Sequence, residues 1–226
     1  MERKKHNVEQ NTPEWLAARL GKFTSSQIHR LFTDPRTKNT TKNYGLSNTA
    51  FAYCESKLAE LFYQEDVATF GGNDATLYGH ENEIQARLAF EQITGIETQD
   101  GNFWTYGDNG SSPDWLFNDS FCECKCFYSK VQYVRFVRTV NSADELKAFS
   151  KDYYYQTQHQ LYTTGKDYCI LFGYDGRLLN KKDPKRNSRF YHAVTIHPNE
   201  EVFKQIEARV KVAAEVVQDM LNELLK

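Results

Sequence analysis

The sequence lacks the features of several classes of protein. It contains no run of about 18 consecutive apolar residues, so we expect no helix that spans a lipid bilayer. The N-terminal stretch from Met1 to His6 is polar and no apolar segment follows it, which is unlike a secretory leader and predicts a cytoplasmic protein. Internal repeats and low-complexity tracts are absent as well.

Cysteine is scarce and unevenly placed. The chain has 5 cysteines, and Cys122, Cys124 and Cys126 occupy alternate positions of one short stretch. Neighbouring positions on one face of a strand are poorly placed to form a disulfide, so we expect reduced thiols. The same alternate spacing disfavours ligation of an iron-sulfur cluster, and the scattered histidines disfavour a zinc site.

An excess of positive charge is also absent. The net charge of −2 argues against a protein that coats nucleic acid by bulk electrostatics, although a local basic groove is still compatible with it. Basic residues gather in the segment from Gly176 to Arg189. A solvated loop between two strands and a loop that contacts phosphates are both open interpretations of this segment.

What is present describes a soluble globular domain. The 226 residues are 40% hydrophobic, 26% charged and 14% aromatic, and we expect them to form a single domain over residues 1–226. A polar stretch at 36–43 predicts a loop. The apolar patterns and the turn residues predict helices at about 13–20, from Thr24 onward, 47–65, 75–94, 143–164 and 199–225, and strands at 96–106, 115–117, 121–127, 168–174 and 190–196.

The most informative stretch is Ser112-Pro113-Asp114 followed by a strand from Cys122 to Cys126. Side chains alternate between the two faces of a strand, so Glu123 and Lys125 share one face and the three cysteines share the other. Cysteine behaves as a small hydrophobic residue that suits the packed face. The strand therefore presents a carboxylate and an ammonium group beside Asp114.

This set of residues suits a magnesium site. Mg²⁺ prefers oxygen ligands and needs only one or two carboxylates when substrate phosphates complete its shell. Asp114 and Glu123 can supply the carboxylates, and the backbone carbonyl of Cys124 can add an oxygen. Lys125 could hold or help deprotonate an attacking water, or stabilise charge on a phosphate. The alternative is an ordinary surface pair of Glu and Lys beside a turn aspartate.

Glu83 is a candidate third carboxylate. In the predicted helix at 75–94 it shares a stripe with Ala86, Phe90 and Ile93, which is largely apolar. A carboxylate on such a stripe requires a partner. Arg87, one turn further along, and a metal ion facing the core are both open possibilities.

The helix predicted at 143–164 offers polar groups on one face. Tyr153, Gln156 and Gln160 are spaced by three and seven residues, so they project together, either toward a polar site or toward solvent. Glutamine can orient a water without competing as a base. His159 has no second histidine at metal-ligand spacing and is more typical of a structural residue.

A phosphate site is predicted near the N-terminus. The segment Thr24-Ser25-Ser26 opens a predicted helix, whose free amides and dipole favour an anion. Ser25 and Ser26 add hydroxyl donors, and Arg19 ends the preceding helix within reach. Simple capping of the helix by Thr24 or Ser25 is the alternative.

Together these residues resemble the phage lambda-type exonucleases, the YqaJ-like viral recombinases of the PD-(D/E)xK nuclease superfamily. The resemblance implies an α/β fold with a restriction-endonuclease-like core, in which helices flank a mixed central β-sheet. The matching stretches are, in order, Trp15-Leu16-Ala17-Ala18-Arg19-Leu20-Gly21 with Thr24-Ser25-Ser26; Gly79 with Glu83 and Ala86-Arg87; Ser112-Pro113-Asp114; Glu123-Cys124-Lys125; and Tyr153 to Gln158 leading to Gly165.

The resemblance also implies an activity. Such an enzyme degrades one strand of linear double-stranded DNA from its 5′ end, releases mononucleotides, and leaves a 3′ single strand for recombination by strand annealing. The implied cofactor is Mg²⁺, two ions per site, with Mn²⁺ as a substitute. The implied roles are metal binding by Glu83, Asp114, Glu123 and the Cys124 carbonyl; water handling by Lys125 and Gln156; 5′-phosphate binding by Arg19, Ser25, Ser26 and Ser112; and lining of the site by Tyr153 and Gln158.

Partners follow from the same resemblance. The family implies a 5′-phosphorylated duplex as substrate, a homotrimeric ring, a single-strand-annealing protein as partner, and a phage or prophage origin. Two other functions on this core stay open, namely a structure- or sequence-specific endonuclease and a non-catalytic module that binds DNA ends. This chain departs from the family at Trp115, where glycine commonly follows Pro-Asp.

Overall fold

The computed structural model describes residues 2–10, 12–35, 43–65 and 74–226. The loop predicted at 36–43 lies outside the described residues except for its last residue, Asn43. In the described part of the chain, no helix is both long enough and apolar enough to cross a membrane.

A mixed five-stranded sheet forms the centre of the molecule, in the order β3-β6-β7-β8-β9. Strands β7 and β8 are parallel, and the other neighbouring pairs are antiparallel. This sheet confirms the predicted mixed central sheet. Its strands are β3 (Gln99–Asp100), β6 (Trp115–Phe117), β7 (Ser120–Cys126), β8 (Cys169–Tyr174) and β9 (Tyr191–Ile196).

A second sheet of four strands, in the order β1-β4-β5-β2, was not predicted. The strand predicted at 96–106 is broken at Gly101 and Asn102, where Asn102 has a left-handed φ of 59°, so β3 and β4 enter different sheets. β1 has no apolar pattern and forms through its pairing with β4. The strands are β1 (Arg3–His6), β2 (Phe23–Thr24), β4 (Phe103–Tyr106) and β5 (Asn109–Ser111).

The helices follow the predicted positions with several differences. Ser150 breaks the helix predicted at 143–164, because it ends α5 and its side chain caps α6 by accepting a hydrogen bond from the Tyr153 N–H. Helices α4 and α7 were not predicted. The helices are α1 (Pro13–Arg19), α2 (Asn48–Tyr63), α3 (Asp74–Thr94), α4 (Lys130–Thr139), α5 (Ala143–Phe149), α6 (Lys151–Thr164), α7 (Pro184–Asn187) and α8 (Glu200–Leu224), with 3₁₀ helices η1 (Ile28–Phe32) and η3 (Gly176–Leu178).

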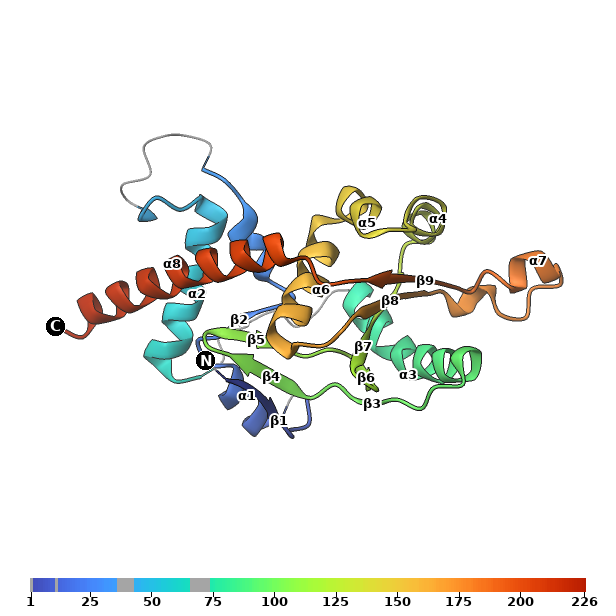
Figure 1. Cartoon of the computed structure of the whole chain (residues 1–226), viewed down its shortest axis with the longest axis horizontal. Helices are drawn as coiled ribbons and strands as arrows, with labels where there is room; N and C mark the ends of the chain where they lie inside the picture. The colour runs from blue at the N-terminus through green and yellow to red at the C-terminus, as the bar shows by residue number, and fades with distance from the viewer. Residues whose placement is uncertain (1, 11, 36–42, 66–73) are drawn as a thin grey trace.

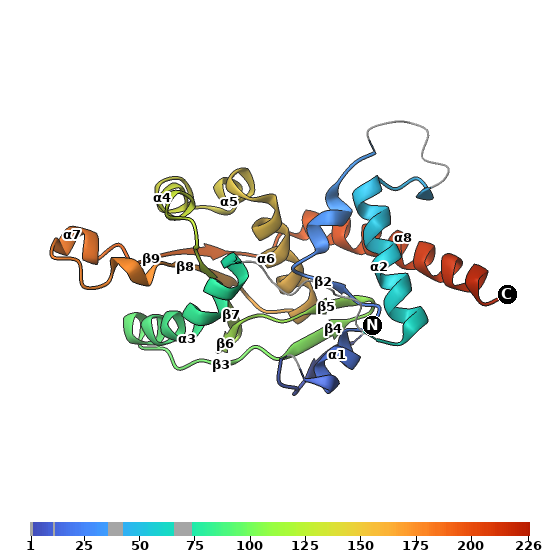
Figure 2. The ribbon, with the colours of Figure 1, turned by 180° about the vertical axis from the view of Figure 1, so that it is seen from behind.

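Helices cover both faces of the central sheet (Figures 1 and 2). On one face α3 buries Ala86 and Phe90 against Cys122 of β7, and Cys124 and Cys126 pack beside them. On the other face lie α4, α5 and α6, which pack against the opposite side chains of β7, β8 and β9. The predicted alternation is confirmed, since the cysteines of β7 face α3 and Glu123 contacts α6.

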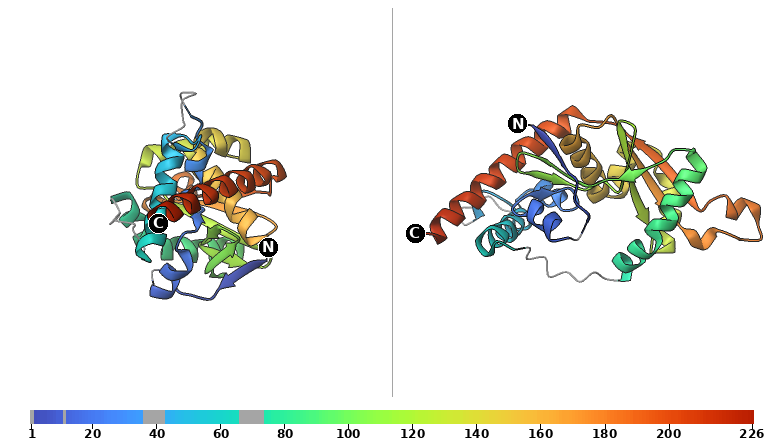
Figure 3. Two further views of the ribbon diagram at one scale, coloured as in Figure 1. Left: turned by 90° about the vertical axis from the view of Figure 1, so that its left-hand side faces the viewer. Right: turned by 90° about the horizontal axis from the view of Figure 1, so that it is seen from below.

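The two ends of the molecule differ in shape (Figure 3). At one end the amphipathic helix α8 lies against α2 and buries an apolar stripe that includes Val202, Ile206 and Val210. At the other end the connection between β8 and β9, which carries α7, projects from the body as an arm. The central sheet and α6 lie between these ends.

Candidate active site

The predicted aspartate lies directly before one strand, and the predicted glutamate and lysine lie on the strand paired with it. β6 begins directly after Asp114 and pairs antiparallel with β7, so that Trp115 lies opposite Cys122. This pairing brings Asp114 beside β7, where its Oδ2 accepts a hydrogen bond of 2.6 Å from the backbone N–H of Cys124. Asp114 is therefore fixed against the strand that carries Glu123 and Lys125.

A glycine holds the turn that carries Asp114. The N–H of Gly101 donates to the carbonyl oxygen of Asp114 at 3.1 Å. A Cβ atom at Gly101 would lie only 1.6 Å from the carbonyl oxygen of Pro113, so any larger residue would push the two segments apart. Gly101 was not among the predicted site residues. The only local signal is that Gly101 and Asn102 interrupt a run of strand-forming residues.

Glu123 lies at the centre of a buried network. Its side chain is 3% exposed, and its Oε1 accepts hydrogen bonds of 2.6 Å from both Lys125 Nζ and Gln156 Nε2. Its Oε2 accepts a hydrogen bond of 2.5 Å from Gln160 Nε2. Three donors from β7 and α6 thus fix both oxygens of this carboxylate.

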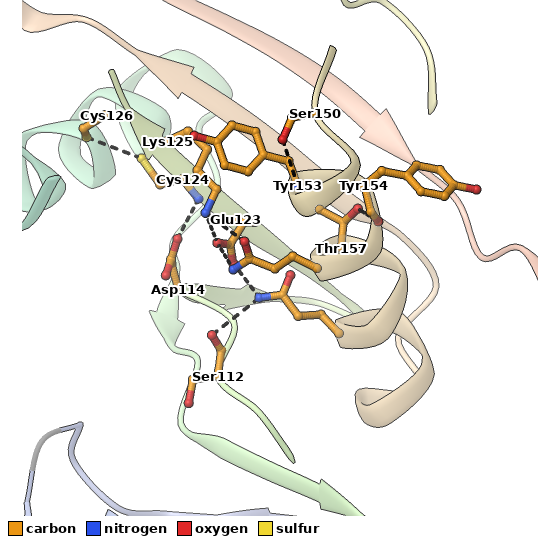
Figure 4. A network of polar contacts seen from close by, with 12 residues as sticks. Ser112, Asp114, Glu123, Cys124, Lys125, Cys126, Ser150, Tyr153, Tyr154 and Thr157 are labelled. Carbon is orange, nitrogen blue, oxygen red and sulfur yellow. Dashed lines mark hydrogen bonds and ion pairs between the residues drawn. The ribbon is translucent and has the colours of Figure 1, made fainter. Parts of the chain in front are cut away.

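Lys125 links the strand to helix α6 (Figure 4). Its Nζ also donates to Gln156 Oε1 at 3.1 Å and lies 4.9 Å from the ring centroid of Tyr153. The predicted common face of Tyr153, Gln156 and Gln160 is therefore present, and it points toward Glu123 and Lys125 rather than toward solvent. Gln160, whose contact with Glu123 was not anticipated, is fully buried.

Glu83 approaches the same group from α3. It lines a cavity of about 380 Å³ together with Asp114 and Ser112. Its carboxylate is 3.9 Å from His80, whereas Arg87 donates to Thr98 and to Asp100 at 2.6 Å. The alternative in which Arg87 is the main partner of Glu83 is thus not supported, because the guanidinium is engaged on the other side.

Burial and neighbouring negative charge raise the proton affinity of two acidic groups at the site. Burial raises the pKa of Asp114 well above its usual value, and the negative charge of Glu123 adds to the effect. Burial likewise raises the pKa of Glu83. Burial alone would lower the pKa of Lys125, but the carboxylates of Glu123 and Asp114 outweigh burial and raise it. When all three carboxylates are ionised, they leave two negative charges that Lys125 does not compensate, which suits a divalent cation.

Part of the predicted phosphate site lies beside Asp114. The Nε1–H of Trp15 donates to Ser112 Oγ at 3.3 Å, and the guanidinium of Arg19 lies 4.0 Å from the Trp15 ring centroid. Trp15 and Ser112 line the same cavity as Asp114. Arg19 and Ser112 are thus connected through Trp15, which was not among the predicted site residues.

The prediction that an α-helix begins at Thr24-Ser25-Ser26 and binds phosphate at its N-terminus is wrong. The residues after Ser26 form η1, a 3₁₀ helix of five residues without a side-chain cap, because β2 draws Phe23 and Thr24 into pairing with β5. Ser25 is buried and its Oγ lies 2.7 Å from His159 Nδ1. Ser26 is exposed. Ser25 therefore belongs to the interior, and no α-helix N-terminus exists at this point.

His159 and Gln158 are structural in this arrangement. His159 Nε2 lies 2.9 Å from Asn109 Oδ1, so the ring joins Ser25 to β5, as a structural histidine would. Gln158 is fully buried, donates to the carbonyl oxygen of His197 and accepts a hydrogen bond from the N–H of Asn199. The prediction that Gln158 lines the site is wrong, since Gln158 follows Gln156 by two residues and so projects about 200° away from it around the helix.

The comparison with known protein families gives one match. The YqaJ-like viral recombinase domain matches residues 14–167 of the 226-residue chain. The chain belongs to this family. All the residues that meet around Glu123 lie within the matched segment, whereas the whole projecting arm and all of α8 lie beyond it.

Solved structures show the fold of this YqaJ-like protein. An alkaline exonuclease, LHK-Exo from Laribacter hongkongensis, matches with 23% identity and a TM-score of 0.75, over 94% of this chain and 96% of that chain. Its complex with dAMP matches with 22% identity, a TM-score of 0.76 and the same coverage. A phage-related exonuclease from Haemophilus somnus matches with 18% identity and a TM-score of 0.68, over 90% and 96% of the two chains.

These matches confirm the PD-(D/E)xK-like fold. No protein with a curated description matches the sequence. Membership of the family, together with the exonuclease fold, supports a nuclease.

Trp115, the departure from the family pattern, leaves the strand intact. Its backbone is part of β6, and its buried ring lies 6.0 Å from that of Phe90 in α3. The indole thus fills the core beneath α3, while Gly101 provides the close backbone approach beside Asp114. Within the family pattern, Trp115 adds packing and does not disturb the turn.

The donor set of this YqaJ-like site fits a hard divalent cation only in part. Asp114, Glu83 and Glu123 offer oxygen atoms and surplus negative charge, as Mg²⁺ prefers. Within the residues that the structure describes, however, no three acidic, histidine or cysteine side chains form a group that could hold a metal ion by themselves. The oxygens of Glu123 are occupied by Lys125, Gln156 and Gln160, so water or substrate phosphate would have to complete the shell.

Proposed function

We propose that this protein is a Mg²⁺-dependent exonuclease that degrades one strand of linear double-stranded DNA in the 5′→3′ direction. The observation that carries the proposal is the buried contact of Glu123 with Lys125 and Gln156, beside Asp114, in a chain of the YqaJ-like family. A purely DNA-binding protein has no need for a lysine held between a carboxylate and an amide.

The reaction is the hydrolysis of a phosphodiester bond. A water oxygen forms a new bond to phosphorus, the bond from phosphorus to the 3′ oxygen of the terminal nucleotide breaks, and that oxygen takes up a proton. The products are a mononucleotide and a strand with a new 5′-phosphate. Two magnesium ions, when bound, would polarise the phosphate and lower the pKa of a water molecule, and Mn²⁺ could replace them.

The residues of the chain position the reactants. Glu83, Asp114, Glu123 and the carbonyl of Cys124 would hold the ions. Lys125 Nζ, already 2.6 Å from Glu123 Oε1, can hold the attacking water or donate to a phosphate oxygen as negative charge develops there. Gln156 binds both Glu123 and Lys125, so it orients the pair. Tyr153 limits the movement of the lysine through its ring.

The polarity of the reaction depends on the terminal phosphate. We assign Arg19 and Ser112 to that phosphate, since both contact Trp15, which lines the cavity at Asp114. The proposal that mononucleotides are released is supported by the structural likeness to LHK-Exo, which has been solved in complex with dAMP. The family likeness also leads us to propose a homotrimeric ring and a single-strand-annealing partner.

The test is an assay of nucleotide release. Linear duplexes that carry a 5′-phosphate or a 5′-hydroxyl should be degraded at different rates, with Mg²⁺ or Mn²⁺ and not with chelator. Arg19→Ala should lose the preference for the phosphorylated end. Closed circular duplex should survive intact.

Each contrary result identifies another function. Cleavage of closed circles would indicate an endonuclease on the same core. Binding of duplex ends without any release of nucleotides would indicate a non-catalytic module. Equal activity in chelator would overturn the magnesium assignment, and a ring of three subunits can be checked by light scattering of the full chain.

A further inference from the structure

The projecting segment 176–189, which we call the basic arm, carries an unusual concentration of positive charge. Residues 176–189 and the helix α4 at 130–139 together hold nine basic residues and one acidic residue, although the whole chain has a net charge of −2. The rest of the chain is therefore strongly acidic. Such separation of charge on one surface is typical of contacts with a polyanion.

The basic side chains of the arm point to solvent. Lys181, Lys182, Lys185, Arg186 and Arg189 are all exposed. Among the described residues, only Arg186 of this group has an ion pair, with Asp183 at 3.3 Å. Asp183 also accepts a hydrogen bond from the Lys185 N–H and so caps α7. Asp183, the one acidic residue of the arm, thus stabilises the conformation of the arm. It leaves most of the positive charge of the arm free to bind an anion.

The base of the arm is anchored beside the candidate active site. Arg177 is bound to buried Asp175 at 2.7 Å and donates to the backbone carbonyls of Phe127 and Tyr128 at 2.7 and 2.9 Å. Those two residues directly follow β7, the strand of Glu123 and Lys125. On the α4 side, the Tyr133 hydroxyl donates to the carbonyl oxygen of Arg189 at 2.6 Å.

The same residues border a cavity that reaches Lys125. This cavity, of about 660 Å³, is lined by Lys125, Tyr153, Phe127, Tyr128 and Gln132 among others. On α4, beyond its rim, lie the exposed side chains of Lys130, Arg135 and Arg138. The lining also includes Asp152, opposite in charge to Lys125, so most of the positive charge lies outside the cavity. A DNA strand with one phosphate at Lys125 could therefore place its next phosphates, outside the cavity, against the basic surface.

We propose that the basic arm and the exposed face of α4 bind the phosphate backbone of the DNA duplex next to the strand end that is being cleaved. This proposal rests on the proposed nuclease function. The surface suits a duplex rather than a single strand, because residues 181–189 contain no aromatic side chain on which bases could stack. Lysine and arginine contacts to phosphate position a duplex without reading its sequence, as a non-specific nuclease requires.

The experiment measures binding of a fluorescent 5′-phosphorylated duplex by the full chain in chelator, so that no cleavage occurs. Three variants are compared with the native protein. The arm variant is Lys181→Gln/Lys182→Gln/Lys185→Gln, the α4 variant is Arg135→Gln/Arg138→Gln, and the matched control is Lys204→Gln/Lys211→Gln/Lys226→Gln, whose residues are exposed at the α8 end of the chain.

Each phosphate contact that is lost should reduce the slope of log Kd against log salt by about one. We expect a reduction of about three for the arm variant and about two for the α4 variant, with no change for the control. With Mg²⁺, the KM for duplex should rise while kcat stays the same. Unchanged salt slopes in the arm variant would overturn the proposal, and so would an equal loss in the control.

Measuring the binding of single-stranded DNA tests whether the basic arm prefers a duplex. If the arm variant loses affinity for a single strand as much as for a duplex, the assignment to duplex is wrong. Failure of the nuclease function would look different, because the native protein would then release no nucleotides whatever the arm variant does.

Discussion

Two buried polar clusters are built on the same helix, and they differ in charge. Toward the central sheet, Gln156 and Gln160 of α6 bind Glu123 and reach Lys125. Toward the second sheet, His159 of α6 binds Ser25 and Asn109. The first cluster contains charged groups beside a cavity, whereas the second is fully buried and neutral.

The pKa values express this difference. Burial lowers the pKa of His159 to about 3, so the imidazole is neutral at physiological pH and can accept from Ser25 and donate to Asn109. In the charged cluster, burial and neighbouring carboxylates raise the pKa of Asp114. A closed neutral cluster stabilises the fold, while an unbalanced charged cluster is suited to bind a cation and substrate.

Replacing Lys125 should show the largest difference in function between the charged cluster and the neutral cluster. In Lys125→Ala we expect nucleotide release from linear duplex to fall about 10³-fold, because a donor aimed at developing charge is lost. The loss of the ion pair with buried Glu123 should also lower the free energy of unfolding, measured in urea, so nucleotide release is compared per folded molecule. Activity close to native in Lys125→Ala would show that the charged cluster is not the site of chemistry.

Removing the imidazole should have the opposite effect. His159→Ala removes the hydrogen bonds of the imidazole with Ser25 and Asn109 and opens a cavity, so we expect the free energy of unfolding to fall by about 3 kcal/mol. Release of nucleotides per folded molecule should stay near the native value at a temperature where the variant is folded. Loss of activity without loss of stability would mean that the neutral cluster takes part in the reaction.

Two glutamines on α6 provide a matched pair. Gln160→Leu removes the donor to Glu123 Oε2, and we expect activity to fall about 10-fold to 100-fold with a higher Mg²⁺ requirement, as for other residues that orient a ligand. Gln158→Leu removes contacts with His197 and Asn199 on the other side of the helix. That control should lower stability while leaving the Mg²⁺ dependence unchanged.

The same effect on Mg²⁺ dependence in both glutamine variants would contradict this assignment of the helix faces. Assays at several Mg²⁺ concentrations, together with urea unfolding of each variant, distinguish the two results.

The smallest predicted effect is the pH dependence of the neutral cluster. The pKa of His159 is about 3 in the folded protein and about 6.5 in the unfolded chain, so only the unfolded chain binds the proton between these values. His159 therefore contributes its full stability above pH 6.5 and loses about 1.4 kcal/mol for each unit of pH below it.

Urea unfolding of the native protein and His159→Gln at pH 7.5 and 5.0 measures this contribution. The stability difference between the two proteins should shrink by about 2 kcal/mol at the lower pH. A difference that is independent of pH would show that His159 is not held neutral.

Local patterns in the sequence were enough for much of the fold. The alternation of apolar and charged residues from Cys122 to Cys126 predicted which face of β7 packs, and the spacing of Tyr153, Gln156 and Gln160 predicted one polar helix face. Both are present because these features depend on strand and helix geometry within a few residues. The strand order and the second sheet depend on long-range pairing, for which β1, with its charged sequence, gives no local signal.

The sequence by itself determined the family, the mixed central sheet and the group of Asp114, Glu123 and Lys125, because these are carried by short motifs in a fixed order. Only the tertiary structure decided that Gln160 binds Glu123, that Ser25 is held by His159 rather than at a helix N-terminus, and that Gly101 closes the turn at Asp114. Each of these contacts joins segments far apart in the chain, and the packing of the whole molecule selects the partner that a buried polar group receives.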